Sequence, residues 1–413
     1  RAYDNGAREL TNVIIQPTGG VQRRPGFYFV DGTPGPARLV DFEFNTEQAY
    51  LLVIGDRTLT IYRDGIKRAE ITTPWLMDQL FDLVWTQSAD TLLVCHPDTP
   101  PKVISRSSDT NWSIDDWQYI ESEESGVRHQ PYFKFASDGA TLSLSGTSGT
   151  ITAISSEPLF QASHLGTRLR IKGGEGIITD IGSATVATVD LLEDLPDSQT
   201  TVDWMEQAFS EVRGWPVTVA FHQDRLVIGG SRDLPNRLWF SRSGDLFNFD
   251  LGEGLDDEAI EFAILSDQIN AIRVLFSCRH LHVYTSGAEW MVTGEPLTPQ
   301  TVQLNRQTRI GSRTDRFIPP VNVDGATLYS GRTGNELREF LYTDVEQAYQ
   351  SNDLALLARH LYKGPVDQAF DPRQRVLFSP LADGTMAALT IYRAEAVTAW
   401  SRIRTDGAFE SVA

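Results

Sequence analysis

The chain has 413 residues, of which 41% are hydrophobic and 10% aromatic, so it can bury a substantial core. Its net charge of −19, from 36 basic and 55 acidic residues, argues against a protein that grips nucleic-acid phosphates. No apolar run approaches the roughly 20 residues of a membrane-spanning helix. No secretory signal is visible behind Arg1, so we expect synthesis in a cytoplasm.

Short runs of β-branched and aromatic residues, bounded by Gly, Pro, Asn and Asp, recur from end to end, whereas long helical periodicity is nearly absent. The sequence therefore predicts an all-β fold. Two short helices are expected, over residues 73–83 and 352–361. Cys95 and Cys278 each lie in an apolar run, which predicts two reduced, buried thiols rather than a disulfide.

A hairpin of two apolar strands around a turn occurs six times. The copies span residues 49–62, 90–104, 224–241, 280–292, 326–340 and 375–392. Apart from one long gap they recur about every 40 to 55 residues, the period expected of a four-stranded propeller blade. We therefore predict a β-propeller-like ring of about six blades, which would leave only short sheet edges exposed.

The long gap between the second and third hairpins holds a different kind of segment, residues 126–214. Its strand-like runs are short, alternate apolar with small polar residues, and are separated by Gly-rich turns. This pattern predicts a small β-barrel or sandwich inserted between blades. The predicted organisation is thus a first part of the propeller over 1–125, the insertion over 126–214, and a second part of the propeller over 215–413.

Motifs of catalysis are missing from the sequence. It contains no G-x-x-x-x-G-K-[ST], no G-x-S-x-G and no H-E-x-x-H. His280 and His282 would share one face of a strand, as metal ligands could, but no third ligand is evident nearby. We predict no catalytic, cofactor-binding or metal-binding residues, and hence no enzyme.

The densest acidic group contains Glu253, Asp256, Asp257, Glu258 and Glu261. We take Asp256, Asp257, Glu258 and Glu261 as the candidate acidic face of a channel, because a wall past which DNA must slide benefits from repulsion. Ordinary acidic residues at a strand edge, which favour solubility, explain the same group.

Several stretches carry a resemblance to a known family. The opening Asn5–Gly26 (NGARELTNVIIQPTGGVQRRPG) is the most extensive. Further matches follow in order at Phe42–Phe44, Gln48–Tyr50, Gln87–Asp90, His96–Pro97, Gly214–Pro216, Phe221–Leu226, Ser241–Asp245 and Thr285–Trp290. Together they resemble the tail nozzle proteins, also called tail tubular protein B, of short-tailed bacteriophages and prophages.

The resemblance covers nearly all the chain, although the insertion matches only loosely. It implies a structural subunit of the virion that forms a ring, expected to be a hexamer, below the phage portal and adaptor. Such a ring extends the DNA ejection channel, and DNA passes through it without specific binding. The family is generally longer at both ends, so we expect these residues to be part of a longer polypeptide. No cofactor or catalytic residue is implied.

A ring subunit must present two different complementary surfaces, because contacts around a rotation axis are heterologous. The basic turn at Arg23 and Arg24 is one candidate for such a surface. The alternative function, from another class, is a carbohydrate-binding or glycan-cleaving propeller used for host adhesion. Ser241–Phe249 distantly resembles the Asp-box turn of sialidase-type propellers, although that turn is structural rather than catalytic.

Overall fold

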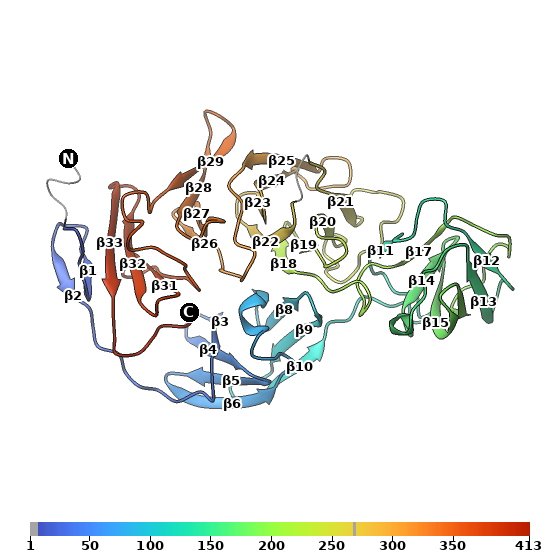
Figure 1. The fold of residues 1–413 in the computed structure, drawn as a ribbon, viewed down its shortest axis with the longest axis horizontal. Coiled ribbons are helices and arrows are strands. Elements are labelled where there is room, and N and C mark those ends of the chain that lie inside the picture. Colours follow the sequence, from blue (N-terminus) through green and yellow to red (C-terminus); the bar gives the residue numbers. More distant parts are fainter. Residues whose placement is uncertain (1–6, 267–269) are drawn as a thin grey trace.

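The computed structural model describes residues 7–266 and 270–413, and these residues form an almost entirely β structure. Six four-stranded antiparallel sheets are arranged around a common axis as the blades of a propeller (Figure 1). The all-β, propeller-like ring of about six blades predicted from the repeated hairpins is confirmed.

The first three blades are built in chain order. Blade 1 consists of β3 (Arg38–Asn45), β4 (Gln48–Gly55), β5 (Thr58–Arg63) and β6 (Ile66–Thr72). Blade 2 consists of β7 (Val84–Ser88), β8 (Thr91–His96), β9 (Thr99–Arg106) and β10 (Trp112–Asp116). Blade 3 consists of β18 (Thr218–His222), β19 (Arg225–Gly229), β20 (Arg237–Phe240) and β21 (Ile260–Ala263).

The remaining blades follow without interruption. Blade 4 consists of β22 (Ile272–Ser277), β23 (Leu281–Thr285), β24 (Glu289–Thr293) and β25 (Gln303–Thr308). Blade 5 consists of β26 (Val321–Val323), β27 (Ala326–Ser330), β28 (Leu337–Thr343) and β29 (Ala348–Asp353). Blade 6 consists of β30 (Ala369–Asp371), β31 (Val376–Pro380), β32 (Met386–Tyr392) and β33 (Val397–Ile403).

The six hairpins read from the sequence are the two middle strands of each blade. Every residue of β19, β23 and β27 is buried, because a middle strand packs against neighbouring blades on both faces. Outer strands such as β6 and β25 are largely exposed. Hydrophobic clusters join blade to blade, one between blades 1 and 2 and another between blades 3 and 4. The blades therefore share their cores and stabilise one another.

The ring closes between blade 6 and blade 1 through a buried ion pair and the C-terminal segment. The Arg38 guanidinium lies 3.2 Å from the Asp367 carboxylate, and both side chains are almost fully buried. Ser411 Oγ donates to Asp367 (2.5 Å) and accepts a hydrogen bond from the Leu39 N–H (3.0 Å). Polar contacts from three distant parts of the chain thus join the first and last blades.

An N-terminal hairpin flanks blade 6 on its outer side. It consists of β1 (Val13–Ile15) and β2 (Val21–Arg23). The Asn12 N–H donates to Arg402 O (2.8 Å), and the Arg402 N–H donates to Leu10 O (2.8 Å), so the start of the hairpin runs parallel to β33. In Figure 1 this hairpin lies at the left-hand end of the molecule.

Between blades 2 and 3 the chain leaves the ring and forms a lobe at the opposite end (Figure 1). Its strands are β11 (Tyr132–Phe133), β12 (Leu142–Leu144), β13 (Thr150–Ser155), β14 (Arg168–Ile171), β15 (Gly174–Ser183), β16 (Val186–Leu191) and β17 (Trp204–Gln207). They pair as one antiparallel sheet in the order β11-β17-β14-β15-β16-β13-β12 around a core of their own. All seven strands belong to this single sheet. Its two edge strands are β11 and β12, and no strand pairing between them closes the sheet in the described part of the lobe.

The two expected helices do not form. Residues 73–83 contain only the 3-10 helix η1 (Leu80–Asp82), and a second one, η2 (Ala162–His164), lies in the insertion. In the other segment Asn352 belongs to β29, and the residues after it form overlapping turns. Segments this short are marginal as isolated helices, and here the links between blades decide their conformation. Within residues 7–266 and 270–413 no helix is long and apolar enough to span a bilayer.

Candidate functional site

A cavity of about 680 Å³ lies at the axis of the propeller and is lined by the first strands of every blade except blade 3. Apolar side chains dominate the lining, among them Val84, Phe276, Val321 and Phe370. This volume is typical of a small-molecule pocket. A DNA channel would therefore have to run outside the propeller, through an assembly of several subunits.

The four candidate channel-facing acids lie in and just after the loop that joins β20 to β21 at the periphery of blade 3. None of them lines the axial cavity. Asp256 and Asp257 are exposed, whereas Glu258 and Glu261 are half-buried. The structure thus brings these residues together on the outside of the ring, near the base of the inserted lobe (Figure 1).

Two of these acids are paired with arginines. A hydrogen bond from Arg242 holds the pKa of Asp257 below its usual range. Glu261 pairs with Arg237, yet burial raises its pKa. The net negative charge of the loop is therefore smaller than its four carboxylates suggest.

Arg225 fixes the backbone of this loop. Its guanidinium donates to Ser241 O (2.7 Å), Glu258 O (2.6 Å) and Asp256 O (2.9 Å), and burial lowers its pKa. In the stretch that resembles an Asp-box, Asn248 Nδ2 donates to Asp245 Oδ2 (3.1 Å) and closes a turn. The Arg225 side chain, which belongs to one of the family-like stretches, thus has a structural task that the sequence did not reveal.

The two arginines of the basic turn in the N-terminal hairpin, Arg23 and Arg24, have different environments. Arg23 is exposed. Arg24 is half-buried, and its guanidinium donates to Asn12 Oδ1 (3.0 Å), to Pro25 O (2.8 Å) and to Arg404 O (3.3 Å). Arg24 therefore holds the hairpin to the end of blade 6, and of the two only Arg23 offers its charge to another molecule. Asn5 and Gly6, which open the family-like stretch, lie outside the described residues.

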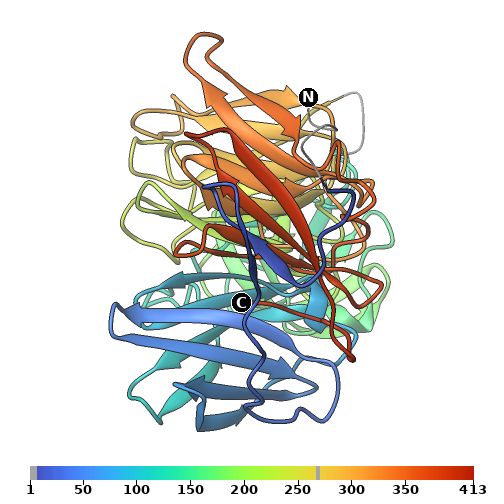
Figure 2. The ribbon, with the colours of Figure 1, turned by 90° about the vertical axis from the view of Figure 1, so that its left-hand side faces the viewer.

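Directly after this turn lies an exposed segment, the aromatic strap (Phe27–Val30), which carries no motif that would mark it as a site in the sequence. Tyr28 is 88% exposed and Phe29 77%. The strap is anchored at both ends, because the Phe27 ring packs on Phe409 and the Tyr62 hydroxyl donates to Asp31 Oδ2 (2.8 Å). In Figure 2, where the left-hand end of Figure 1 faces the viewer, the chain here runs across this end from the N-terminal hairpin to blade 1.

Of the two histidines, His282 is buried and His280 is half-buried. His282 is packed against the Tyr349 ring at 4.5 Å, and the Nδ1 atom of His280 lies 3.1 Å from the Tyr349 hydroxyl. His222, from the neighbouring blade, bonds Ser277 at 2.9 Å. Burial and the neighbouring histidines lower the pKa of His222 to about 4 and that of His282 to about 3. In the described residues no three His, Cys, Asp or Glu side chains are grouped as metal ligands would be.

Both cysteines are free thiols. Cys95 is buried, as expected, and burial raises its pKa. Cys278 is only half-buried, because it follows the end of β22 in the turn toward β23, and its sulfur accepts a hydrogen bond from Asn322 Nδ2 (3.2 Å).

The last family-like stretch, Thr285–Trp290, is also structural. The buried Glu289 carboxylate accepts hydrogen bonds from the Gly311 N–H (2.8 Å) and the Ile310 N–H (3.3 Å), and burial raises its pKa. Gly311 has a positive φ of 80°, and a Cβ there would lie 2.4 Å from Ser286 O. This glycine is therefore required where the chain leaves blade 4.

No known family model matches this sequence, and neither does any curated protein. Among solved structures, BamB from Moraxella catarrhalis is similar over 91% of this chain and 91% of its own, at 10% identity and a TM-score of 0.39. The β-propeller domain of Cps50 from Myceliophteria thermophila is similar over 83% of this chain and 80% of its own, at 9% identity and a TM-score of 0.39.

Hsv2 from Kluyveromyces lactis covers 89% of this chain and 97% of its own, at 10% identity and a TM-score of 0.33. At such identities and TM-scores these likenesses carry no argument about what the chain does. The propeller fold stands on the strand order and pairing described above.

Proposed function

We propose that this chain is a structural subunit of the tail nozzle of a short-tailed phage. In this proposal several copies form a ring, expected to be a hexamer, that extends the DNA ejection channel below the portal and adaptor of the virion. The family-like stretches support it, since they run from the N-terminal hairpin to blade 4. The proposal gives the chain no catalytic step.

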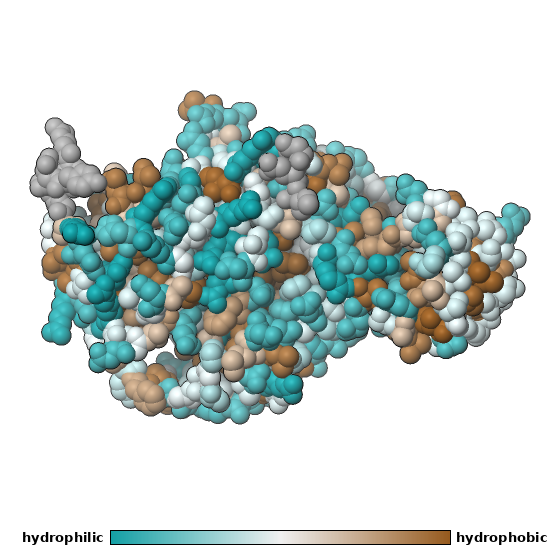
Figure 3. Space-filling view, viewed as in Figure 1, coloured by the Kyte–Doolittle hydropathy of each residue, from teal (hydrophilic) through white to brown (hydrophobic). Residues whose placement is uncertain are grey.

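The observation that carries the proposal is the placement of two different exposed apolar surfaces. The aromatic strap crosses one end of the long axis, and the inserted lobe forms the other (Figures 1 and 2). The lobe exposes Leu165 (61%), Val202 (52%) and Ile154 (48%), and Figure 3 shows apolar atoms on it. A heterologous ring contact needs such a pair of unlike surfaces at separated positions.

The charge of the chain suits a wall that DNA slides past. With a net charge of −19 the subunit repels phosphates over much of its surface, so a passing duplex would not be held. The exposed Asp256 and Asp257 are the residues of the blade 3 loop that we expect to face this passage.

The strap provides a direct test. Replacing Tyr28 and Phe29 by Ser should shift the mass measured by multi-angle light scattering from ring to monomer, because these two side chains supply exposed aromatic area for the contact. The matched control is Val345→Ser, at the 98% exposed tip between β28 and β29, which should leave the ring intact.

The proposal fails if the unmodified chain stays monomeric at every protein concentration and binds an oligosaccharide tightly. That result would favour the host-adhesion alternative. If the ring still forms when Tyr28 and Phe29 are replaced, the strap is not part of the contact between subunits.

A further inference from the structure

Three histidines lie close together where blades 3, 4 and 5 adjoin. His222 ends β18 of blade 3, His280 lies in the turn between β22 and β23 of blade 4, and His282 belongs to β23. Burial lowers the pKa of His222 and of His282, and a charge on His280 lowers both further. The three imidazoles therefore form one electrostatic group, the histidine cluster.

The cluster joins each of these blades to the next. His222 Nδ1 lies 2.9 Å from Ser277 Oγ, at the end of β22 in blade 4. His280 Nδ1 lies 3.1 Å from the Tyr349 hydroxyl, on β29 of blade 5. Both contacts lie at strand ends, so they can separate without breaking the strand pairing of whole blades.

His282 is buried in a way that does not accommodate a second proton. Its Nδ1 atom lies 3.3 Å from Thr327 Oγ1 of blade 5 and 3.4 Å from the Tyr284 hydroxyl. Its Nε2 atom is buried without a hydrogen-bond partner among the described residues, and the residue is 1% exposed. A protonated imidazole donates from both nitrogens, so a proton on His282 would leave a buried, charged N–H without an acceptor.

Carboxylates do little to balance a positive charge in the cluster. In the described parts of the chain, the groups that act electrostatically on the two buried members are other histidines. Burial and Arg279 lower the pKa of the half-buried His280, whereas Glu295 raises it. Arg279 itself pairs with Asp344 at 3.2 Å on the exposed surface.

The other titratable side chains packed on the cluster or bonded beside it are three phenols and one thiol: Tyr284, Tyr342, Tyr349 and Cys278. Phenols and thiols gain no charge when the pH falls. The imidazoles are therefore the groups in this contact that respond to mild acid.

We propose that the histidine cluster is an acid-sensitive contact, which loosens the edges of blades 3, 4 and 5 while the other blades stay closed. The buried imidazoles take up protons when this edge opens and water reaches them, so acid favours the open form. Below pH 6.5, each histidine that is protonated only in the open form raises its population by up to about tenfold per pH unit. The inference does not depend on the role of the chain in a phage tail.

Amide hydrogen exchange at several pH values tests this contact. Protection factors compare each amide with a free peptide at the same pH, and so remove the direct effect of acid on exchange. Between pH 6.5 and 5 the protection of residues 276–282 should fall about hundredfold, because two buried imidazoles contribute. At pH 5 it should also lie about tenfold or more below that of Thr91–His96, in the middle of blade 2.

His282→Gln should reduce the loss of protection over residues 276–282 to about tenfold, because one buried imidazole remains. His222→Gln, from the neighbouring blade, should do the same and provides a second variant if the first does not fold. The matched control is His360→Gln, at an exposed position, which should behave as the unmodified chain does.

The measurement on the unmodified chain decides the proposal even without the variants. The proposal is overturned if the protection of residues 276–282 does not change with pH. It is equally overturned if residues 276–282 and Thr91–His96 fall to the same protection, since the whole ring would then open at once. Losses in His282→Gln and His222→Gln as large as in His360→Gln would also overturn it.

Discussion

At the scale of single residues, buried charges hold distant parts of the chain together. Arg38 stands at the start of the first blade, and Asp367 precedes the first strand of the last one. Burial lowers the pKa of the Arg38 guanidinium, although Asp367 beside it favours its charged form. Each of the two buried charges is therefore stabilised by its partner.

Removing Asp367 should open this closure. Asp367→Ala leaves the Arg38 charge buried and unpaired and removes the acceptor for Ser411, so we expect the free energy of unfolding to fall by about 3–5 kcal/mol. Urea unfolding measures the loss. Asp41→Asn, on the exposed side of β3, should change it by less than about 0.5 kcal/mol, and equal effects of the two substitutions would contradict this account.

The buried histidines predict a dependence of stability on pH. In the unfolded chain both have the usual pKa of 6.5, whereas in the fold the pKa of His222 is about 4 and that of His282 about 3. As the pH falls below 6.5, the unfolded state binds protons that the folded state does not. Stability should therefore decrease by about 1.4 kcal/mol per pH unit for each histidine, until the pH reaches the folded-state values.

Thermal unfolding between pH 6.5 and 5 measures this slope before most carboxylates titrate. His282→Gln should flatten it, because glutamine does not titrate. His360→Gln, at an exposed position, should leave the slope unchanged. A slope that is the same in all three chains would show that other groups control the pH dependence.

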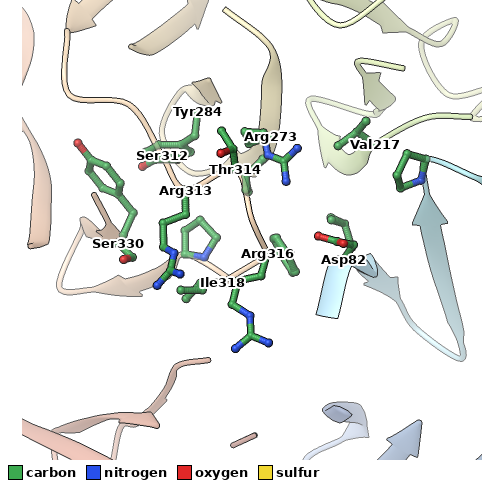
Figure 4. A pocket seen from close by; sticks show the side chains of 16 residues that line it. Asp82, Val217, Arg273, Tyr284, Ser312, Arg313, Thr314, Arg316, Ile318 and Ser330 are labelled. Carbon is green, nitrogen blue, oxygen red and sulfur yellow. The ribbon is translucent and has the colours of Figure 1, made fainter. Parts of the chain in front are cut away.

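Residue-scale sites were the least predictable from the sequence. Asp82, Arg273, Arg313 and Arg316 line one small pocket (Figure 4) although they come from distant parts of the sequence, so only the closed propeller places them in the same lining. Phe27–Val30 has the composition of a strand, and its exposure follows from its position across the outside of the ring. Neither feature produces a pattern that can be recognised in a short stretch of the sequence.

At the scale of elements, the sequence located the two middle strands of every blade and missed most of the others. The second strand of a blade is buried on both faces and can form a continuous apolar run, as Leu92–Cys95 does within β8. A fourth strand such as Ile66–Thr72 contains only exposed and half-buried positions, so its sequence resembles that of a loop. The expected helix over 352–361 does not form, because these residues are an irregular link between blades. In this link Leu354 packs against the core, whereas Leu357 is 68% exposed, so the leucines do not share one buried face.

The rates of amide hydrogen exchange should reflect this difference in burial between the strands of a blade. Amides of the middle strands β8, β19, β23 and β27 are bonded on both sides within the sheet and covered by neighbouring blades, so they should exchange slowest. Amides of the outer strands β6, β10, β25 and β29 lie at exposed sheet edges and should exchange much faster. Mass spectrometry of peptic peptides distinguishes the two sets, and equal protection of outer and middle strands would contradict the blade assignment.

At the scale of the whole molecule, a propeller with an inserted lobe at one end and an exposed aromatic strap at the other presents unlike surfaces to its neighbours (Figures 1 and 2). The propeller axis holds only a cavity of about 680 Å³, so any DNA passage must be built by several copies. The repeat in the sequence was sufficient to predict the ring of blades. The proposed assembly depends instead on surfaces that appear only when the chain has folded.

Electron microscopy of negatively stained particles tests the central proposal most directly, because it shows both the number of subunits and their symmetry. The account predicts closed rings with a single rotation axis, an open central passage, and each inserted lobe against the strap-bearing end of the next subunit. Particles that remain single propellers at all protein concentrations, or that pair about a two-fold axis through identical surfaces, would contradict it.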